Sequence, residues 1–167
     1  MLSRSLQGGR SAGKQQMNQT RRAIVAGFGP VGRLVCEGLA DAGFEVTVLE
    51  TNPQTVETQR RLGRRILAGD ACDPATLREA GIETADTLVL TMPSEDDALR
   101  ACRAAHAIRP EVFISARTNY LSKGMLAAKA GADHVVVEEL VTAEAMRDAV
   151  VGHLCDDGRP NAKRLDD

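Results

Sequence analysis

The chain has 167 residues, 43% of them hydrophobic and 2% aromatic, which suffices for one domain with an aliphatic core. Its formal net charge of −2 excludes a generally basic surface, so we expect no nucleic-acid partner. No apolar run reaches the roughly 18 to 20 residues that span a bilayer, so we predict a cytoplasmic chain. The four cysteines lack zinc-binding spacing, so we predict reduced thiols and no metal site.

The two ends of the chain differ in composition from the middle. Residues 1–21 are rich in Gly, Ser and Gln and lack the apolar stretch of a signal peptide, which predicts a disordered linker or leader. Residues 156–167 are predicted to be a loose polar tail. We therefore expect one nucleotide-binding domain over residues 22–155.

Between these ends, short apolar strands alternate with amphipathic helices. Strands are predicted at 23–26, 45–49, 65–68, 87–91, 112–116 and 134–137. Helices are predicted at 30–42 and 53–62, between the cap Asp73 and Gly81, after the cap Ser94, from the cap Asn119 to Gly131, and at 140–154. Six such alternations predict an α/β fold, namely a single Rossmann-like doubly wound domain with a six-stranded parallel sheet and helices on both faces.

The first strand is followed by a glycine-rich motif of the form G-x-G-x-x-G, which comprises Gly27, Phe28, Gly29, Pro30, Val31 and Gly32. In a dinucleotide site the first glycine permits a tight turn, the second lets backbone approach a pyrophosphate, and the third allows the helix to pack on the strand. The N-terminus of the helix then presents free N–H groups to phosphates. The alternative is a turn whose glycines serve packing only.

An acidic residue follows at the spacing that this motif requires. Glu50, followed by Thr51, ends the second strand about twenty residues after the glycines. A carboxylate there accepts hydrogen bonds from the adenosine ribose and repels a 2′-phosphate, which favours NAD over NADP. The alternative is an ordinary exposed glutamate.

Other candidate residues follow the third, fourth and fifth strands, whose carboxyl ends border the ligand crevice of a doubly wound sheet. Asp70 either accepts from an adenine amino group or caps its own loop, and its neighbours Ala71 and Cys72 are expected in the same pocket. Thr91 and Met92 are expected near the second half of a dinucleotide, unless Thr91 merely ends its strand. Arg117 either reaches a phosphate or is an ordinary solvated arginine.

These motifs together resemble a known family. The sequence contains, in the family's order, AGFGPVG (26–32), VLE (48–50), AGDACDPATLREAGIETAD (68–86), SAR (115–117) and AGADHVVVEE (130–139). Over about residues 22–150 the chain resembles the RCK N-terminal domain, also called the KTN or TrkA-N domain. The third stretch is the most specific, because ordinary dehydrogenases lack it. The resemblance is greatest to the cytosolic domains of Kef-type cation–proton antiporters.

The resemblance implies a nucleotide-sensing domain or subunit that controls a potassium or cation channel or antiporter at the inner face of the cell membrane. It implies NAD(H), or AMP, ADP or ATP, as a regulatory ligand. The glycines would hold phosphates, Glu50 the ribose and Asp70 the adenine, with Arg117 near the phosphates or near a neighbouring subunit's ligand. Two departures are Pro30, where the family often has Arg, and Ala98, where many members have Asn. The first disfavours a tightly bound triphosphate more than NAD or AMP.

Two alternative functions use the same fold. An NAD-dependent oxidoreductase normally needs a substrate domain, and this chain has no Tyr-x-x-x-Lys pair. A redox-sensing transcription factor needs a DNA-binding module, for which residues 1–20 are too short and too polar. We therefore expect no enzyme activity. The edge of the last strand and the apolar side of the last helix predict a homodimer or a higher, ring-like oligomer, in agreement with the resemblance.

Overall fold

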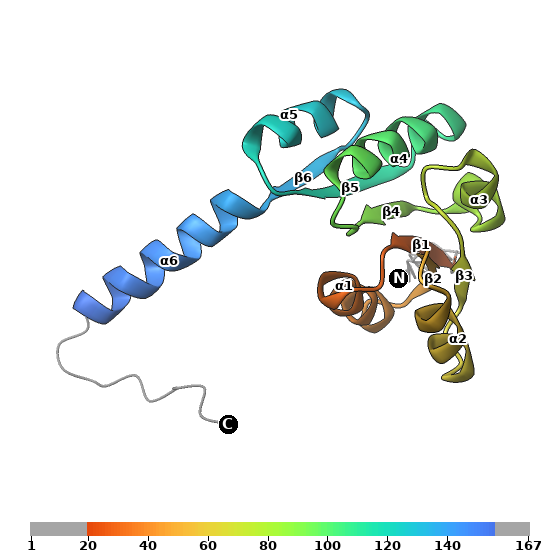
Figure 1. Cartoon of the computed structure of the whole chain (residues 1–167), viewed down its shortest axis with the longest axis horizontal. Helices are drawn as coiled ribbons and strands as arrows, with labels where there is room; N and C mark the ends of the chain where they lie inside the picture. Colours follow the sequence, from red (N-terminus) through yellow and green to blue (C-terminus); the bar gives the residue numbers. More distant parts are fainter. Residues whose placement is uncertain (1–19, 156–167) are drawn as a thin grey trace, which may run out of the picture.

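The computed structural model describes residues 20–155, and the predictions for residues 1–19 and 156–167 lie outside the described part (Figure 1). Six parallel strands form one sheet, as predicted, and their order in it is β3-β2-β1-β4-β5-β6. The strands are β1 (Arg21–Ala26), β2 (Phe44–Glu50), β3 (Ile66–Ala68), β4 (Thr87–Leu90), β5 (Phe113–Thr118) and β6 (His134–Val137). Strand β1 begins before its apolar run because the pairing with β2 continues to Arg21. The strand order reverses between β1 and β4, where such sheets bind ligands.

Six helices and one short turn connect the strands. They are α1 (Pro30–Asp41), α2 (Pro53–Arg61), α3 (Pro74–Glu79), η1 (Ile82–Thr84), α4 (Glu95–Ile108), α5 (Leu121–Lys129) and α6 (Glu138–Cys155). Helices α1 and α2 pack on one face of the sheet, where Cys36 and Val56 contact the strands. Helices α3, α4 and α5 cover the other face with a larger core that includes Leu88 and Ile114. The prediction of helices on both faces is confirmed.

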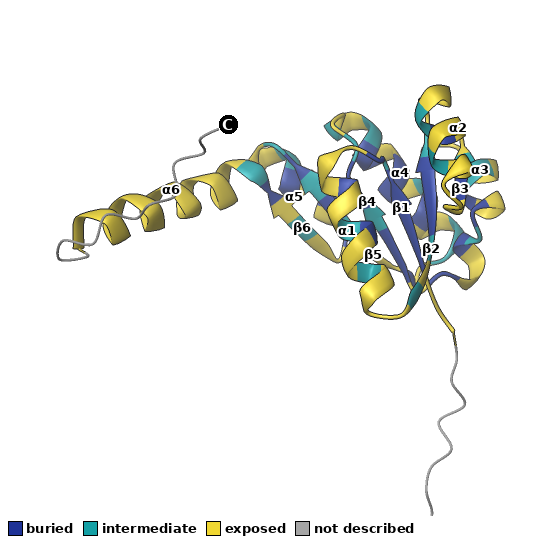
Figure 2. Ribbon diagram, turned by 90° about the horizontal axis from the view of Figure 1, so that it is seen from below, coloured by how far each residue is buried: buried dark blue, intermediate teal, exposed yellow. Residues whose placement is uncertain are grey.

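The helix layer that contains α1 and α2 leaves part of the sheet open. Along β5, Ile114 and Ala116 are buried, whereas the alternating residues Ser115 and Arg117 stay partly exposed. Helix α6 extends away from the body of the domain and buries none of its residues (Figures 1 and 2). None of the helices within residues 20–155 combines the length and the apolar character needed to cross a bilayer.

Two of the three predicted helix caps are present. Asp73 accepts a hydrogen bond from Ala75 N at 3.0 Å, and Ser94 accepts one from Asp97 N at 3.3 Å. The prediction that Asn119 caps the next helix was wrong, because α5 begins after Tyr120 and its cap residue makes no side-chain hydrogen bond.

Carboxylates from two neighbouring helices replace the predicted cap of α5. Glu95 of α4 accepts from the backbone N–H groups of Asn119 and Tyr120 at 2.7 and 3.3 Å, and Glu139 of α6 accepts from Leu121 N at 2.7 Å. These acceptors are far from α5 in the sequence, so local capping rules do not find them.

Helix α1 approaches the turn after β1 too closely for any side chain at Gly32. A Cβ atom at Gly32 would lie 2.1 Å from the carbonyl oxygen of Gly27. Gly38 lies on the same helix, and a Cβ there would meet nothing within 4 Å. Packing therefore requires a glycine at position 32 and not at position 38. Only Gly32 belongs to the glycine-rich motif of the sequence.

We predict that Gly32→Ala lowers the free energy of unfolding by about 1–3 kcal/mol, since the helix and the loop must separate. Gly38→Ala is the matched control, and we expect it to be neutral or to stabilise the helix by about 0.5–1 kcal/mol. Urea unfolding followed by circular dichroism measures both values. Equal stabilities of the two variants would contradict the close packing.

Candidate functional site

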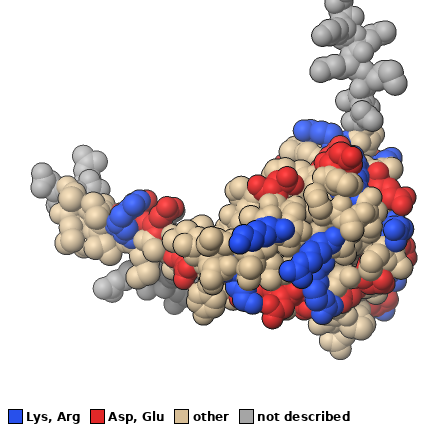
Figure 3. Space-filling view, turned by 90° about the horizontal axis from the view of Figure 1, so that it is seen from above, with Lys and Arg blue, Asp and Glu red and all other residues tan. Residues whose placement is uncertain are grey.

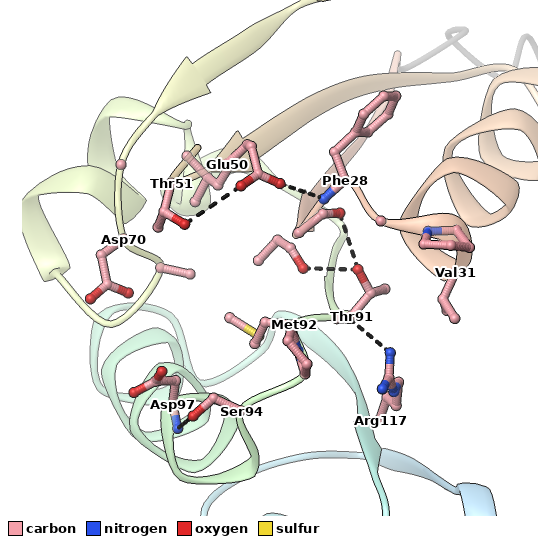
Figure 4. A pocket seen from close by; sticks show the side chains of 18 residues that line it. Phe28, Val31, Glu50, Thr51, Asp70, Thr91, Met92, Ser94, Asp97 and Arg117 are labelled. Atoms are coloured by element: carbon pink, nitrogen blue, oxygen red, sulfur yellow. Dashed lines mark hydrogen bonds between the residues drawn. The ribbon is translucent and has the colours of Figure 1, made fainter. Parts of the chain in front are cut away.

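A cavity of about 480 Å³ lies at the carboxyl ends of the strands, beside the switch point between β1 and β4 (Figure 4). Its walls come from the loops after β1, β2, β3 and β4 and from the end of β5. The lining residues are Ala26, Gly27, Phe28, Gly29, Pro30, Val31, Leu49, Glu50, Thr51, Gly69, Asp70, Ala71, Thr91, Met92, Pro93, Ser94, Asp97 and Arg117. The topology thus brings together residues as far apart in the chain as Ala26 and Arg117.

Nearly all of the predicted site residues line this cavity, and the exceptions are Gly32 and Cys72. Gly32 is instead buried under the loop, where it permits the close packing of α1. The structure adds Ser94 and Asp97 of the α4 N-terminus to the site. The sequence assigned both to ordinary helix capping, and nothing in their local pattern distinguishes that role from a place in a pocket.

The glycine-rich loop has the geometry of an anion cradle. Gly27 has a positive φ of 98° and its N–H donates to Leu49 O at 2.8 Å, which turns the chain sharply after β1. A Cβ atom at Gly29 would meet nothing within 4 Å, so the space above this residue is open. Helix α1 starts at Pro30 without a side-chain cap, and its first N–H groups are therefore free to bind an anion.

Glu50 is held at the edge of the cavity by backbone N–H groups. Its Oε2 accepts from Phe28 N at 2.9 Å, and the Thr51 hydroxyl lies 3.5 Å from its Oε1 (Figure 4). Its Oε1 also accepts from Asn52 N at 2.8 Å. These bonds fix the carboxylate against the glycine-rich loop. Since each carboxylate oxygen has about two acceptor positions, capacity remains for the hydroxyl groups of a ligand.

Asp70 caps its own loop and also lines the cavity. Its Oδ1 accepts from Cys72 N at 2.8 Å, which caps the loop after β3. Its other oxygen lies 3.7 Å from an Arg100 guanidinium nitrogen, and the half-exposed side chain also lines the cavity. The residue is therefore placed to accept from a ligand while it holds its own loop.

Cys72 points away from the cavity toward α4. Its thiol donates to Asp97 O at 3.3 Å. Burial, followed by the hydrogen bond with Asp70 and the negative charge of Asp70, raises the pKa of the Cys72 thiol to about 11. At neutral pH this thiol is not ionised and is a poor nucleophile. The Cys72 side chain thus packs behind the site and does not line the cavity.

Thr91 braces the glycine-rich loop from β4. Its buried hydroxyl oxygen lies 3.0 Å from Ala26 O and 3.1 Å from Gly27 O, so its single proton donates to one of these carbonyl groups. The backbone N–H of Thr91 also donates to Ala26 O at 2.9 Å. Thr91 therefore does more than end its strand, because it sets the position of the loop relative to β4.

Arg117 borders the cavity on the side away from Glu50 and Asp70 (Figure 4). Its Nε lies 2.5 Å from Glu138 Oε1, and its Nη1 lies 3.4 Å from Thr91 O. With 22% of its side chain exposed, it is not the freely solvated arginine of the alternative interpretation. Within residues 20–155, no group of three or more His, Cys, Asp or Glu side chains is arranged to hold a metal ion.

A family model described as the TrkA-N domain matches residues 23–138. The chain belongs to the TrkA-N domain family. Inner membrane protein YbaL of Escherichia coli is 32% identical over 124 residues, which are 74% of this chain and 22% of YbaL. Trk system potassium uptake protein TrkA of Halomonas elongata is 34% identical over 128 residues, which are 72% of this chain and 28% of TrkA. The chain thus spans only about a quarter of these relatives.

Solved structures show the same fold. The crystal structure of the TrkA-N domain of YbaL has a TM-score of 0.75 at 30% identity and covers 78% of this chain and 97% of that one. The Kef CTD of Shewanella denitrificans, solved in an AMP-bound form, has a TM-score of 0.71 at 23% identity and covers 82% and 83%. The predicted membership of the RCK N-terminal family, with relatives among Kef-type proteins, is confirmed.

We predict that Thr91→Val weakens the support of the glycine-rich loop, because the near-isosteric side chain lacks the hydroxyl donor that Ala26 O and Gly27 O share. The free energy of unfolding is expected to fall by about 1–2 kcal/mol. Thr91→Ser retains the hydroxyl group, so the loop bond should survive in this control. Urea unfolding checks the order of stabilities, and a valine variant at least as stable as the serine variant would contradict the bracing role.

Proposed function

We propose that this TrkA-N domain is a nucleotide-sensing regulatory module that controls a potassium or cation channel or antiporter from the cytoplasmic face of the membrane. The observation that carries the proposal is the cavity in which the open glycine-rich loop faces the anchored Glu50 carboxylate. The full-length relatives, which include a Trk system potassium uptake protein, support the transporter partner.

We infer that the ligand is an adenine nucleotide and favour NAD(H), with AMP, ADP or ATP as the other candidates. Glu50 is placed to accept from both hydroxyl groups of the adenosine ribose, and Asp70 is placed to accept from the adenine amino group. The phosphates then lie over Gly29 at the N-terminus of α1. Pro30 supplies no cation to a phosphate chain, which disfavours tight binding of ATP.

We propose that the nucleotide acts as a regulatory ligand and not as a redox cofactor in turnover. The charged groups that line the cavity are Glu50, Asp70, Asp97 and Arg117. Their carboxylates and guanidinium suit the hydroxyl, amino and phosphate groups of a nucleotide. The alternative is an NAD-dependent oxidoreductase fragment, for which a steady-state rate of NADH oxidation with a panel of carbonyl compounds would be the decisive observation.

We predict that NADH raises the melting temperature of the protein more than NADPH does, because a 2′-phosphate removes one donor and sets negative charge against Glu50. In Glu50→Ala the rise in melting temperature caused by NADH should be smaller. The difference between the NADH and NADPH effects should also be smaller. Two lost charge-assisted bonds, each worth about 1.5–3 kcal/mol, weaken NADH binding by about a hundredfold or more. Thermal melting with each nucleotide measures these shifts.

Two further variants serve as controls in the melting experiment. Glu57→Ala removes an exposed carboxylate of α2 that lies outside the cavity, and it should leave both shifts unchanged. Gly29→Val places a side chain in the open space over the loop and should abolish both shifts while circular dichroism stays native. Equal responses of the wild-type protein to NADH and NADPH, or normal NADH binding by Glu50→Ala, would refute the ribose assignment.

We also propose that the domain forms a homodimer through α6 and the open part of the sheet. Helix α6 exposes the apolar residues Leu140, Val141, Met146, Val150, Val151 and Leu154. Figure 3 shows basic and acidic side chains between the apolar parts of this helix. A second cavity of about 480 Å³ lies beside the uncovered strands. Its lining includes Val31, Val35, Val89 and Val136, together with Glu138, Val141 and Thr142 of the first turns of α6. Because both apolar surfaces belong to one chain, a twofold arrangement buries both, and α6 of a second copy is the expected occupant.

We predict a dimer, or a ring built from dimers, by light scattering at tens of micromolar, well above weak-dimer dissociation constants. Met146→Glu combined with Val150→Glu should yield monomers, since charges on α6 oppose its burial. Leu34→Glu introduces one charge of the same sign at an exposed apolar site of α1 and should leave the dimer intact. A purely monomeric wild-type protein would rule out this assembly.

A further inference from the structure

Arg117 links the nucleotide cavity to the start of α6. Its side chain lines both the nucleotide cavity and the apolar groove beside β5 and β6. Its Nε pairs with Oε1 of Glu138, the first residue of α6, at 2.5 Å, and the two side chains are 22% and 41% exposed. The position of the first turn of α6 therefore depends on a group that also faces the ligand.

The same arginine is connected to the glycine-rich loop through Thr91. Arg117 Nη1 lies 3.4 Å from Thr91 O, and the Thr91 hydroxyl lies within 3.1 Å of Gly27 O. Within residues 20–155, Glu138 is the carboxylate that forms an ion pair with Arg117, whereas Glu95 and Glu139 accept from backbone N–H groups at the start of α5.

The location of Arg117 indicates which part of a nucleotide it meets. Glu50 and Asp70 mark the adenosine end of the cavity, and the first phosphate belongs over Gly29 at the N-terminus of α1. Arg117 lies on the opposite side, at the end of β5 (Figure 4). A second phosphate, as in ADP or NAD, extends toward this side. The guanidinium fork can bind a phosphate in a bidentate manner, more strongly than it binds one carboxylate oxygen.

We propose that Glu138 sets the preference of the site for ligands with a second phosphate, by competing with that phosphate for Arg117. This inference rests on the proposed nucleotide-binding function. A ligand with two phosphates draws Arg117 away from Glu138 and loosens the first turn of α6, whereas AMP leaves the ion pair in place. The two effects are thermodynamically linked. The second phosphate weakens the ion pair by a certain factor, and the ion pair lowers the affinity for the second phosphate by the same factor.

Isothermal titration calorimetry of the whole chain with AMP and with ADP tests the competition. We expect Glu138→Gln to bind ADP about fivefold more tightly than the wild-type protein and to bind AMP with unchanged affinity. A fivefold change matches the strength of a partly exposed ion pair. Glu144→Gln removes the same charge from an exposed position of α6 and should change neither affinity. Hydrogen exchange in residues 138–145 should become faster with ADP and not with AMP.

Two other calorimetric results would contradict the inference. An unchanged ADP affinity in Glu138→Gln shows that no competition exists, and an equal gain for AMP and ADP shows a general charge effect instead. In both cases the proposed nucleotide function stands, because the wild-type protein still binds. If the wild-type protein binds neither AMP, ADP nor NADH, the proposed function and this inference both fall.

Discussion

The close contact between Gly32 of α1 and the carbonyl oxygen of Gly27 is the constraint on which the rest of the site depends. It brings the helix N-terminus directly over the end of β1, and Thr91 then holds the loop in register with β4. Because the helix starts so close to the sheet, its free N–H groups and the open space at Gly29 face the crevice between β1 and β4. An anion bound there is stabilised by backbone dipoles that require no rearrangement.

The two ends of the cavity differ chemically, and this difference gives a ligand its direction. Glu50 and Asp70 present acceptors that are anchored by backbone N–H groups, whereas Arg117 presents donors and is paired with Glu138. Hydroxyl and amino groups suit the first end, and phosphates suit the second. The second end adjoins α6, the one helix of the described chain without a buried residue, so the nucleotide cavity and the open surface of the sheet share a boundary.

Local sequence rules succeeded where the partner of a residue lies nearby in the chain. Asp73 and Ser94 cap their helices as predicted, since each accepts from an N–H group two or three residues ahead. The same rule failed at Asn119, because Glu95 and Glu139 bring carboxylates to that turn from other elements. Cys72 was expected in the pocket for its place after β3, yet the loop turns its thiol toward α4.

The sequence by itself determined the strand and helix alternation, the glycine-rich turn and the position of Glu50, because these follow from periodicity, backbone freedom and fixed spacing. It also indicated that Asp70, Thr91 and Arg117 belong to one edge, since parallel strands end on the same side. Only the tertiary structure decided that Ser94 and Asp97 join the cavity, that Arg117 pairs with Glu138, and that α6 leaves the sheet uncovered. These features depend on contacts between distant segments, and the apolar pattern of α6 is equally compatible with packing on its own sheet or on another chain.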